Sequence, residues 1–185
     1  MTTDVVTRAR SLAAERLSGA PRRWAHVQGV AATAAAIVPL LEPEHADDIL
    51  AATWLHDVGY ASDVATTGFH PVDGAHFAQD AGLPALVVSL IAFHTGAEFE
   101  ARQRGLLAEL AAFAPPPREV LDVITYADMT TSPSGDPISA NERVAEILSR
   151  YDEDDPVFAA VSQSAPELLA SVARVEGRLA AAQPR

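Results

Sequence analysis

The stretch "WLHDVGY" at residues 54–60 places a histidine directly before an aspartate inside an apolar run that favours a helix. Burying an imidazole and a carboxylate is costly unless other groups compensate for the water that they lose. A chain that folds this run into its core must therefore pair His56 and Asp57 with polar partners, or use them to bind a metal ion. The rest of the sequence distinguishes these two arrangements.

The composition predicts packed helices. The chain has 185 residues, enough for one domain with a proper core. Its hydrophobic fraction is 49%, but alanine supplies much of it and aromatic residues only 6%, a mixture that favours helices over sheets. We therefore expect a single all-α domain over residues 1–185, a helical bundle with a motif-bearing core at about 22–133 and C-terminal helices at about 139–182.

Charge and cysteine content limit the kinds of partner and of metal ligand that the protein can use. The net charge of −12 argues against broad electrostatic binding of nucleic acid or of an anionic membrane. With no cysteine, a metal ion must be held by His, Asp or Glu. The N-terminus lacks the pattern of a signal peptide, and the apolar run at 29–41 is too short to span a membrane, so we expect a cytoplasmic protein.

Glycine, proline and capping residues divide the chain into helices. These predicted helices cover about 4–17, 22–40, 43–57, a short one from 70, one from 84 to about 94, 98–113, 118–128 and 139–151, with one or two more before the C-terminus. We expect Gly59 to end the third helix and residues 60–69 to form a loop. Ser139 and Glu142 match the capping-box pattern that opens a helix.

Five segments each bring a metal-ligand type of side chain to the end or the inner face of an apolar helix. These side chains are His26, His56, Asp57, His70, His94 and Asp128. Ligands that converge from facing helices commonly form metal sites in bundles. Taken singly, each histidine is better explained as a hydrogen-bonded core or surface residue, and each aspartate as a cap. We assign His45 to a solvated helix start and His76 to packing or the surface.

The order His26, His56-Asp57, Asp128 resembles the H…HD…D pattern of the HD-domain metal-dependent phosphohydrolases, which have an all-helical fold. The contexts "RWAHVQGVAATA", "AATWLHDVGY" and "YADMTTSP" are similar as well. "FHPVDGAHFA" and "IAFHTGA" resemble segments of HD proteins with extra histidine ligands, and the nearest in motif are small bacterial YqeK-like proteins. The chain departs from them at Ala97, where the YqeK-like pattern has a basic residue, and no GYP tripeptide follows His94.

The resemblance implies a ligand set and a reaction. His26, His56, Asp57 and Asp128 would hold one divalent transition metal ion, and His70 and His94 would complete a second site. Asp57 would be the catalytic residue and could bridge two ions. Ligands without thiols suit Fe, Mn, Ni, Co or Zn. The implied reaction is hydrolysis of a phosphoester or phosphoanhydride bond of a nucleotide or dinucleotide by metal-activated water.

Residues that contact substrate are harder to predict. Arg22 and Arg23 flank the first histidine and could bind a phosphate, with Arg23 the candidate, although exposed positions are as good an explanation. Arg102 and Arg104 fit the surface best. Residues 130–132 could bind a nucleotide or cap the turn after Asp128.

Three other functions remain open. The chain could be a catalytically silent HD module that binds metal or nucleotide as a sensor, an HD oxygenase with a di-iron site, or a helical interaction protein whose His and Asp residues are structural. The expected partner is a small phosphorylated molecule, with no nucleic acid or membrane, and a homodimer is possible. The C-terminal helices would cover the core or form the dimer contact.

Overall fold

The computed structural model describes residues 4–182, and over this range the chain is helical with no strand, only an isolated bridge between Thr131 and Pro137. The all-α prediction is confirmed. The α-helices are α1 (Val5–Leu17), α2 (Pro21–Leu41), α3 (Ala46–Leu55), α4 (His70–Asp80), α5 (Ala85–Phe93), α6 (Ala97–Arg104), α7 (Leu107–Leu110), α8 (Arg118–Met129), α9 (Ala140–Leu148) and α10 (Pro156–Ala182). Single 3₁₀ turns are η1 (Pro43–His45), η2 (Val58–Tyr60) and η3 (His94–Gly96).

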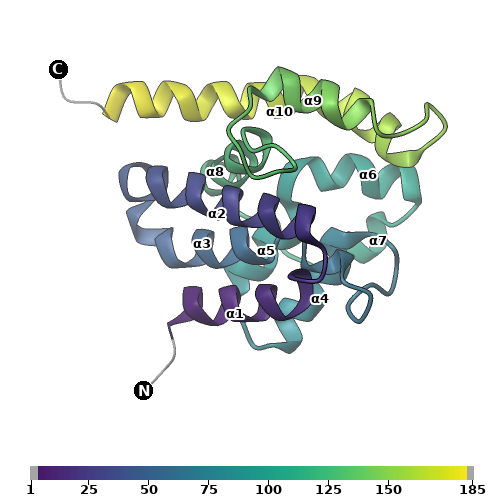
Figure 1. The fold of residues 1–185 in the computed structure, drawn as a ribbon, viewed down its shortest axis with the longest axis horizontal. Helices are drawn as coiled ribbons and strands as arrows, with labels where there is room; N and C mark the ends of the chain where they lie inside the picture. The colour runs from purple at the N-terminus through teal and green to yellow at the C-terminus, as the bar shows by residue number, and fades with distance from the viewer. Residues whose placement is uncertain (1–3, 183–185) are drawn as a thin grey trace.

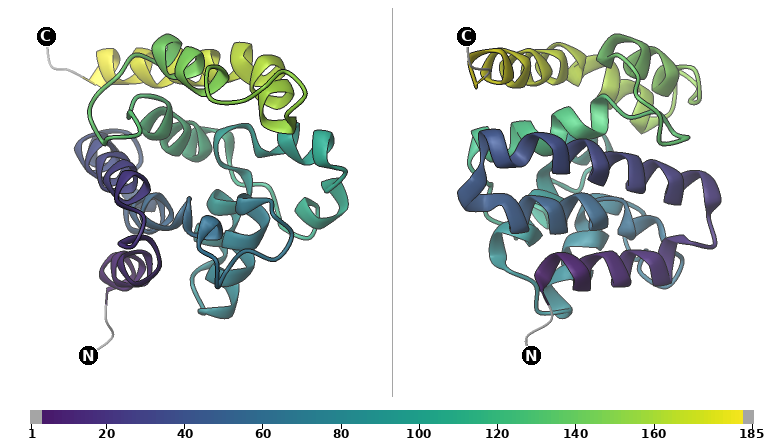
Figure 2. Two further views of the ribbon diagram at one scale, coloured as in Figure 1. Left: turned by 45° about the vertical axis from the view of Figure 1, so that its right-hand side comes forward. Right: turned by 60° about the vertical axis from the view of Figure 1, so that its left-hand side comes forward.

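The helices stack in layers. In Figure 1, α1 lies along one edge and α10 along the opposite edge, with α2, α3, α5 and α8 between them, and Figure 2 keeps this order in two further views. α3 packs against α1, α2 and α5, while α10 packs against α6, α8 and α9. The core between them consists largely of Ala, Val, Leu and Ile side chains, which are small enough for the helices to approach closely.

Several predicted boundaries are wrong, among them the end of the third helix, which stops at Leu55 and not at residue 57. The helix expected over 98–113 is divided at Gly105, whose φ of +72° is the left-handed conformation that ends α6 and separates it from α7. The helix expected to reach 151 ends at Leu148. Its N-terminal capping box is confirmed, because Ser139 and Glu142 hydrogen-bond each other's backbone. The C-terminal segment is one helix, with Pro166 inside it.

Gly59 serves a different purpose from the helix stop that the sequence predicts. α3 already ends at Leu55, and the backbone of Gly59 is not left-handed. Instead η2 lies against the first turn of α4, where a Cβ on residue 59 would collide with the carbonyl oxygen of His70 and lie 2.8 Å from the amide nitrogen of Gly74. Glycine is therefore required here so that two backbone segments can touch.

α2 is longer than the apolar run at 29–41 suggests. Its 21 residues have a mean hydropathy of 1.4 in their most apolar window, which passes a test of length and composition for crossing a membrane. Core helices of soluble proteins pass the same test, and the buried side of α2 includes Val27, Val30 and Ala34 in the core of this fold. Cytoplasmic location stays a prediction.

Candidate metal centre

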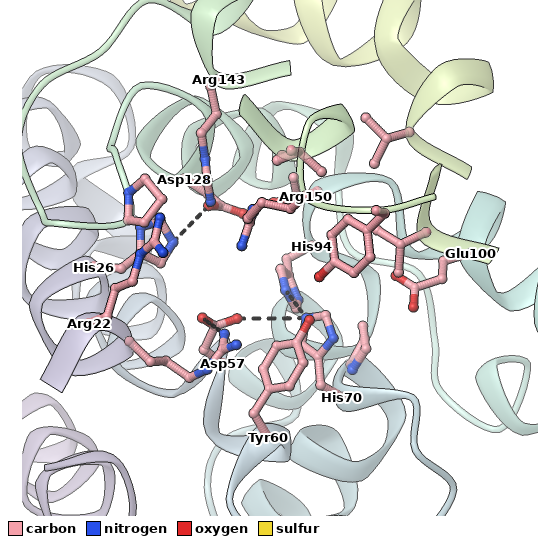
Figure 3. A pocket seen from close by; sticks show the side chains of 18 of the residues that line it. Arg22, His26, Asp57, Tyr60, His70, His94, Glu100, Asp128, Arg143 and Arg150 are labelled. Carbon is pink, nitrogen blue, oxygen red and sulfur yellow. Dashed lines mark hydrogen bonds and ion pairs between the residues drawn. The ribbon is translucent and has the colours of Figure 1, made fainter. Parts of the chain in front are cut away.

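The six predicted ligands come together from five segments. They are His26 on α2, His56 and Asp57 just after α3, His70 at the start of α4, His94 just after α5, and Asp128 in the last turn of α8. Five of them line a cavity of about 410 Å³, and His56 lies buried beside them with no solvent exposure. Figure 3 shows the labelled members of the set pointing toward the same space.

The ligands form two triads, and in each the ligand atoms lie within 4.8 Å of one another. The first consists of His26, His56 and Asp128, with His26 Nε2 3.0 Å from Asp128 Oδ1. The second consists of Asp57, His70 and His94, in which the two Nε2 atoms are 3.1 Å apart. Two ligand atoms that each lie about 2.1 Å from one ion are roughly 3.0–3.4 Å apart, so both pairs have the spacing that a shared ion requires.

Asp57 lies between the triads. Its Oδ1 atom is 3.7 Å from His56 Nε2 on one side and 3.7 Å from His70 Nε2 on the other. The sequence suggested that Asp57 shares an ion with His26, His56 and Asp128. The structure groups it with His70 and His94, within reach of the first triad. The Oδ1 atom thus faces both triads, while Oδ2 pairs with Arg23.

Backbone carbonyls fix the tautomers of three histidines. The Nδ1 atoms of His26, His56 and His94 lie 3.0, 2.8 and 2.6 Å from the carbonyl oxygens of residues 132, 53 and 91, respectively. A carbonyl only accepts, so in each neutral ring Nδ1 carries the proton and Nε2 presents its lone pair to the cavity side.

His56 shows that these residues fit a metal ion. Burial lowers the pKa of its imidazole, so the ring is neutral at pH 7. Its buried Nε2 has no hydrogen-bond partner among residues 4–182. A buried lone pair without a donor costs free energy, and a metal ion is the group that compensates for it while also binding the neighbouring carboxylates.

The two carboxylates are ionised at neutral pH. Burial raises the pKa of Asp57, but the positive charges of His56, whose ring is protonated only in acid, and of Arg23 outweigh it and hold that pKa below its usual value. Arg23 Nη1 lies 2.6 Å from Asp57 Oδ2. Burial likewise raises the pKa of Asp128, but the hydrogen bond and positive charge of His26, which that ring supplies when both of its nitrogens are protonated, bring the pKa of Asp128 well below the usual value. Both groups are thus in the form that binds a cation.

Comparison with known proteins identifies the family. The family model described as HD domain matches residues 23–154, more than two thirds of the chain. The chain belongs to the HD domain family. No curated protein and no solved structure matched it in the other two comparisons. Proteins of the HD superfamily bind divalent metals, are usually hydrolases and are generally soluble, and the His/Asp triads could hold such metals here.

This HD domain contains a strained residue at its centre that sequence reasoning missed. Thr95 has a φ of +46°, which is uncommon for a residue other than glycine. Its hydroxyl donates to Asp128 Oδ2 at 2.5 Å. Strain of this kind persists where the surroundings enforce it, often at functional sites. The "HTG" segment could have pointed to Thr95, because this residue lies between the predicted ligand His94 and a glycine.

Asp73 is a second missed residue, and it acts on the loop before His70. Its carboxylate accepts hydrogen bonds from the backbone amides of Thr66, Thr67 and Gly68 and from both threonine hydroxyls, at 2.8–3.2 Å. These bonds hold residues 66–68 against the first turn of α4. Asp73 lies in the quoted "FHPVDGAHFA" segment, three residues after His70, but no spacing rule linked it to the loop.

The remaining predicted residues take structural positions. Thr130 and Thr131 donate to backbone carbonyls four residues earlier, so they cap α8. Arg102 and Arg104 are exposed on α6, and His76 is exposed with its ring against Phe113. His45 is half-buried at η1, Arg22 is exposed at the cavity rim, and Ser132 is the residue whose carbonyl faces His26.

Proposed function

We propose that this HD domain is a metal-dependent phosphohydrolase that cleaves a phosphoester or phosphoanhydride bond of a nucleotide or dinucleotide. The observation that carries the proposal is the pair of ligand triads with Asp57 between them, beside one cavity. Four arginines also line this cavity, so a phosphate group would find positive charge there. The likeness to YqeK-like proteins remains part of the proposal.

The proposed assignment of ligands to metal ions follows the two triads. His26, His56 and Asp128 would hold one divalent ion, and Asp57, His70 and His94 a second, with Asp57 as the catalytic residue shared between them. Nitrogen and carboxylate ligands suit Fe, Mn, Ni, Co or Zn. Such ions lower the pKa of a coordinated water and neutralise phosphate charge.

The protein's own groups prepare the site for this reaction. The three backbone carbonyls keep imidazole lone pairs turned to the metal positions. Thr95 donates to Asp128 Oδ2, the oxygen that does not face His26 Nε2. Arg23 remains the proposed substrate contact, because its guanidinium lines the cavity and donates to Asp57, next to the position where a phosphate would bind. Its stacking over the ring of Tyr60, with the guanidinium carbon 3.5 Å from the ring centre, fixes its direction.

Metal content is the first test. The protein is purified without chelators or metal-affinity resin, and its metal is measured for the wild type, Asp57→Ala and a matched control, Asp154→Ala, whose side chain is exposed in an acidic turn. We expect about two ions per chain in the wild type and in the control, and a loss in Asp57→Ala. A chain that holds no metal even after reconstitution with Mn or Fe would refute the proposal.

Turnover is the second test. The metal-loaded protein is screened against nucleotides and dinucleotides for release of phosphate or of nucleoside monophosphate. Metal binding without any turnover would instead indicate a silent sensor module. Oxygen uptake with a polyol substrate would indicate an HD oxygenase that uses the same ligands.

A further inference from the structure

The wall of the cavity opposite Asp57 and His70 comes from the C-terminal helices. Its residues are Arg143, Ile147 and Arg150 from α9 and its end, Tyr151, and Val157 and Val161 from the start of α10. In Figure 3, Arg143 and Arg150 approach from this side, and Asp57, Tyr60 and His70 lie across from them. The sequence offered two roles for these helices, covering the core or forming a dimer contact, and neither required them to enter the site.

Arg143 is a buried cation beside the first triad. Only 7% of the residue is exposed, and one of its Nη atoms is 3.7 Å from Asp128 Oδ1. The other Nη atom donates to Glu146 at 2.6 Å, while the buried Nε has no hydrogen-bond partner within residues 4–182. A guanidinium has five donors in a planar fork. Arg143 therefore retains donor capacity in the cavity, directly beside a metal ligand.

Glu146 gathers three guanidinium groups at the same place. Besides Arg143, it pairs with Arg150 Nε at 2.9 Å and with Arg22 Nη2 at 3.6 Å. Glu146, with Asp128 beside Arg143, thus offsets two of the three positive charges, and one positive charge remains in excess on this side of the cavity. The whole chain is strongly acidic, with a net charge of −12, so this cationic patch is a local exception. Clustered arginines of this kind bind phosphate oxygens.

The remainder of the wall is apolar. Ile147, Val157 and Val161 carry no polar side-chain atom, and the ring of Tyr151 lies beside them along the same cavity. At about 410 Å³ the cavity falls within the size range of sites for small ligands. An apolar surface next to clustered arginines suits a molecule with a phosphate at one end and an apolar or aromatic face at the other.

We propose that α9 and the start of α10 form the substrate-recognition wall of the site. Arg143 and Arg150 bind phosphate oxygens of a metal-bound phosphorylated molecule, and Ile147, Val157 and Val161 contact the apolar or aromatic face of its organic group. This assignment rests on the proposed phosphohydrolase function, and it narrows the substrate class to compact phosphorylated molecules that carry such a face.

Inorganic phosphate is the probe for the arginines. Its dissociation constant is measured by calorimetry on metal-loaded protein for the wild type, Arg143→Gln, Arg150→Gln and the control Arg118→Gln, which alters an exposed arginine at the start of α8. Losing charge-assisted hydrogen bonds should weaken phosphate binding by about 10- to 100-fold in the two wall variants. The control should bind as the wild type does, and metal content should be unchanged in all four proteins.

The outcomes separate the two proposals. If the wild type binds metal and phosphate but both wall variants retain its affinity, the recognition wall is refuted and the phosphohydrolase proposal stands. If the metal-loaded wild type binds no phosphate, both proposals fail. Should Arg143→Gln not fold, Arg150→Gln decides alone, because this side chain is 36% exposed and its loss leaves no buried charge.

The apolar part of the wall has its own probe. Adenosine monophosphate and inorganic phosphate are compared on the double variant Val157→Thr/Val161→Thr, which keeps side-chain shape but adds two hydroxyls. We expect adenosine monophosphate to bind about fivefold more weakly or worse, since each hydroxyl would be partly desolvated by the ligand. Phosphate should bind as to the wild type. Equal affinity of the variant and the wild type for adenosine monophosphate refutes the apolar contact.

Discussion

Replacing Gly59 by alanine should damage the second triad although Gly59 carries no chemistry. The new methyl group would collide with the carbonyl oxygen of His70 and lie 2.8 Å from both the carbonyl carbon of His70 and the amide nitrogen of Gly74, closer than the 3.0 Å that real Cβ contacts keep. All these obstacles are backbone atoms. No side-chain rotation relieves the overlap, so the first turn of α4 must move away from η2.

The magnitude follows from overpacking. Forcing an extra carbon into a closed contact typically costs about 1–3 kcal/mol. In a domain of this size each kcal/mol lowers the melting temperature by about 2–4 °C, so we expect a fall of about 2–12 °C. The displaced element begins with His70, whose Nε2 is 3.1 Å from that of His94. Metal retention in the second triad should therefore fall more than retention in the first.

Gly177→Ala is the matched control. Residue 177 lies inside α10, and a Cβ there meets no atom within 4 Å, so alanine should stabilise the helix by about 0.5–1 kcal/mol. Melting temperature and metal content are measured for both variants and the wild type. The reasoning is refuted if Gly59→Ala melts at the wild-type temperature with the wild-type metal content, because the close backbone contact would then not exist.

Substitutions at two further residues test how the ligands are positioned. Thr95→Gly should relieve about 1 kcal/mol of backbone strain, yet it should lower metal retention because Asp128 loses the hydroxyl donor. Thr95→Ser keeps a hydroxyl and should retain metal. Equal metal retention by the two variants would contradict this role of Thr95. Asp73→Asn should cost about 1–2 kcal/mol of unfolding free energy, since an amide nitrogen cannot accept the bonds from residues 66–68, and urea denaturation measures it. Burial raises the pKa of Asp73 but these bonds outweigh it, so the folded pKa is depressed and the stabilisation is present above about pH 4 and lost as the pH falls through the folded value. The difference between Asp73→Asn and the wild type should accordingly shrink as the pH is lowered below about 4, and a gap that does not change with pH would exclude this cause.

The positions of the ligands were predictable because helix boundaries are local. Proline and glycine mark where α2, α4 and α5 begin or end; His70 and His94 stand at such boundaries, and His26 lies in the second turn of α2. How the ligands group is not local. Asp57 follows His56 directly in the sequence, yet the two lie in different triads because α3 ends at Leu55 and the backbone turns between them.

Arg143 could not be predicted for a related reason. It follows Asp128 by a loop and the first turn of another helix, so its position depends on how that loop docks on α2. The docking requires Gly29 and Gly135, because a Cβ on Gly29 would lie 2.7 Å from the Cα of Gly135. No pattern within either segment reports this contact. From the sequence alone, an arginine in an amphipathic helix is expected to lie on the surface, and only the packing shows that Arg143 is buried.

The ends of α3 and α5 show why helix termination and ligand chemistry belong together in this fold. The last carbonyls of a helix have no backbone donor, and here His56 and His94, each just past a helix end, use the carbonyl three residues earlier to hold Nδ1–H. If α5 continued regularly, the Ile91 carbonyl would accept from the amide of Thr95, but the chain leaves the helix at His94, whose ψ is 148°, and that oxygen accepts from His94 Nδ1 instead. Thr95, the next residue, has the strained left-handed backbone. The same residue donates its hydroxyl to Asp128 of the other triad. Thr95 thus directly follows a ligand of one triad and orients the carboxylate of the other, so the two metal positions are linked through the strained His94–Thr95 segment as well as through Asp57.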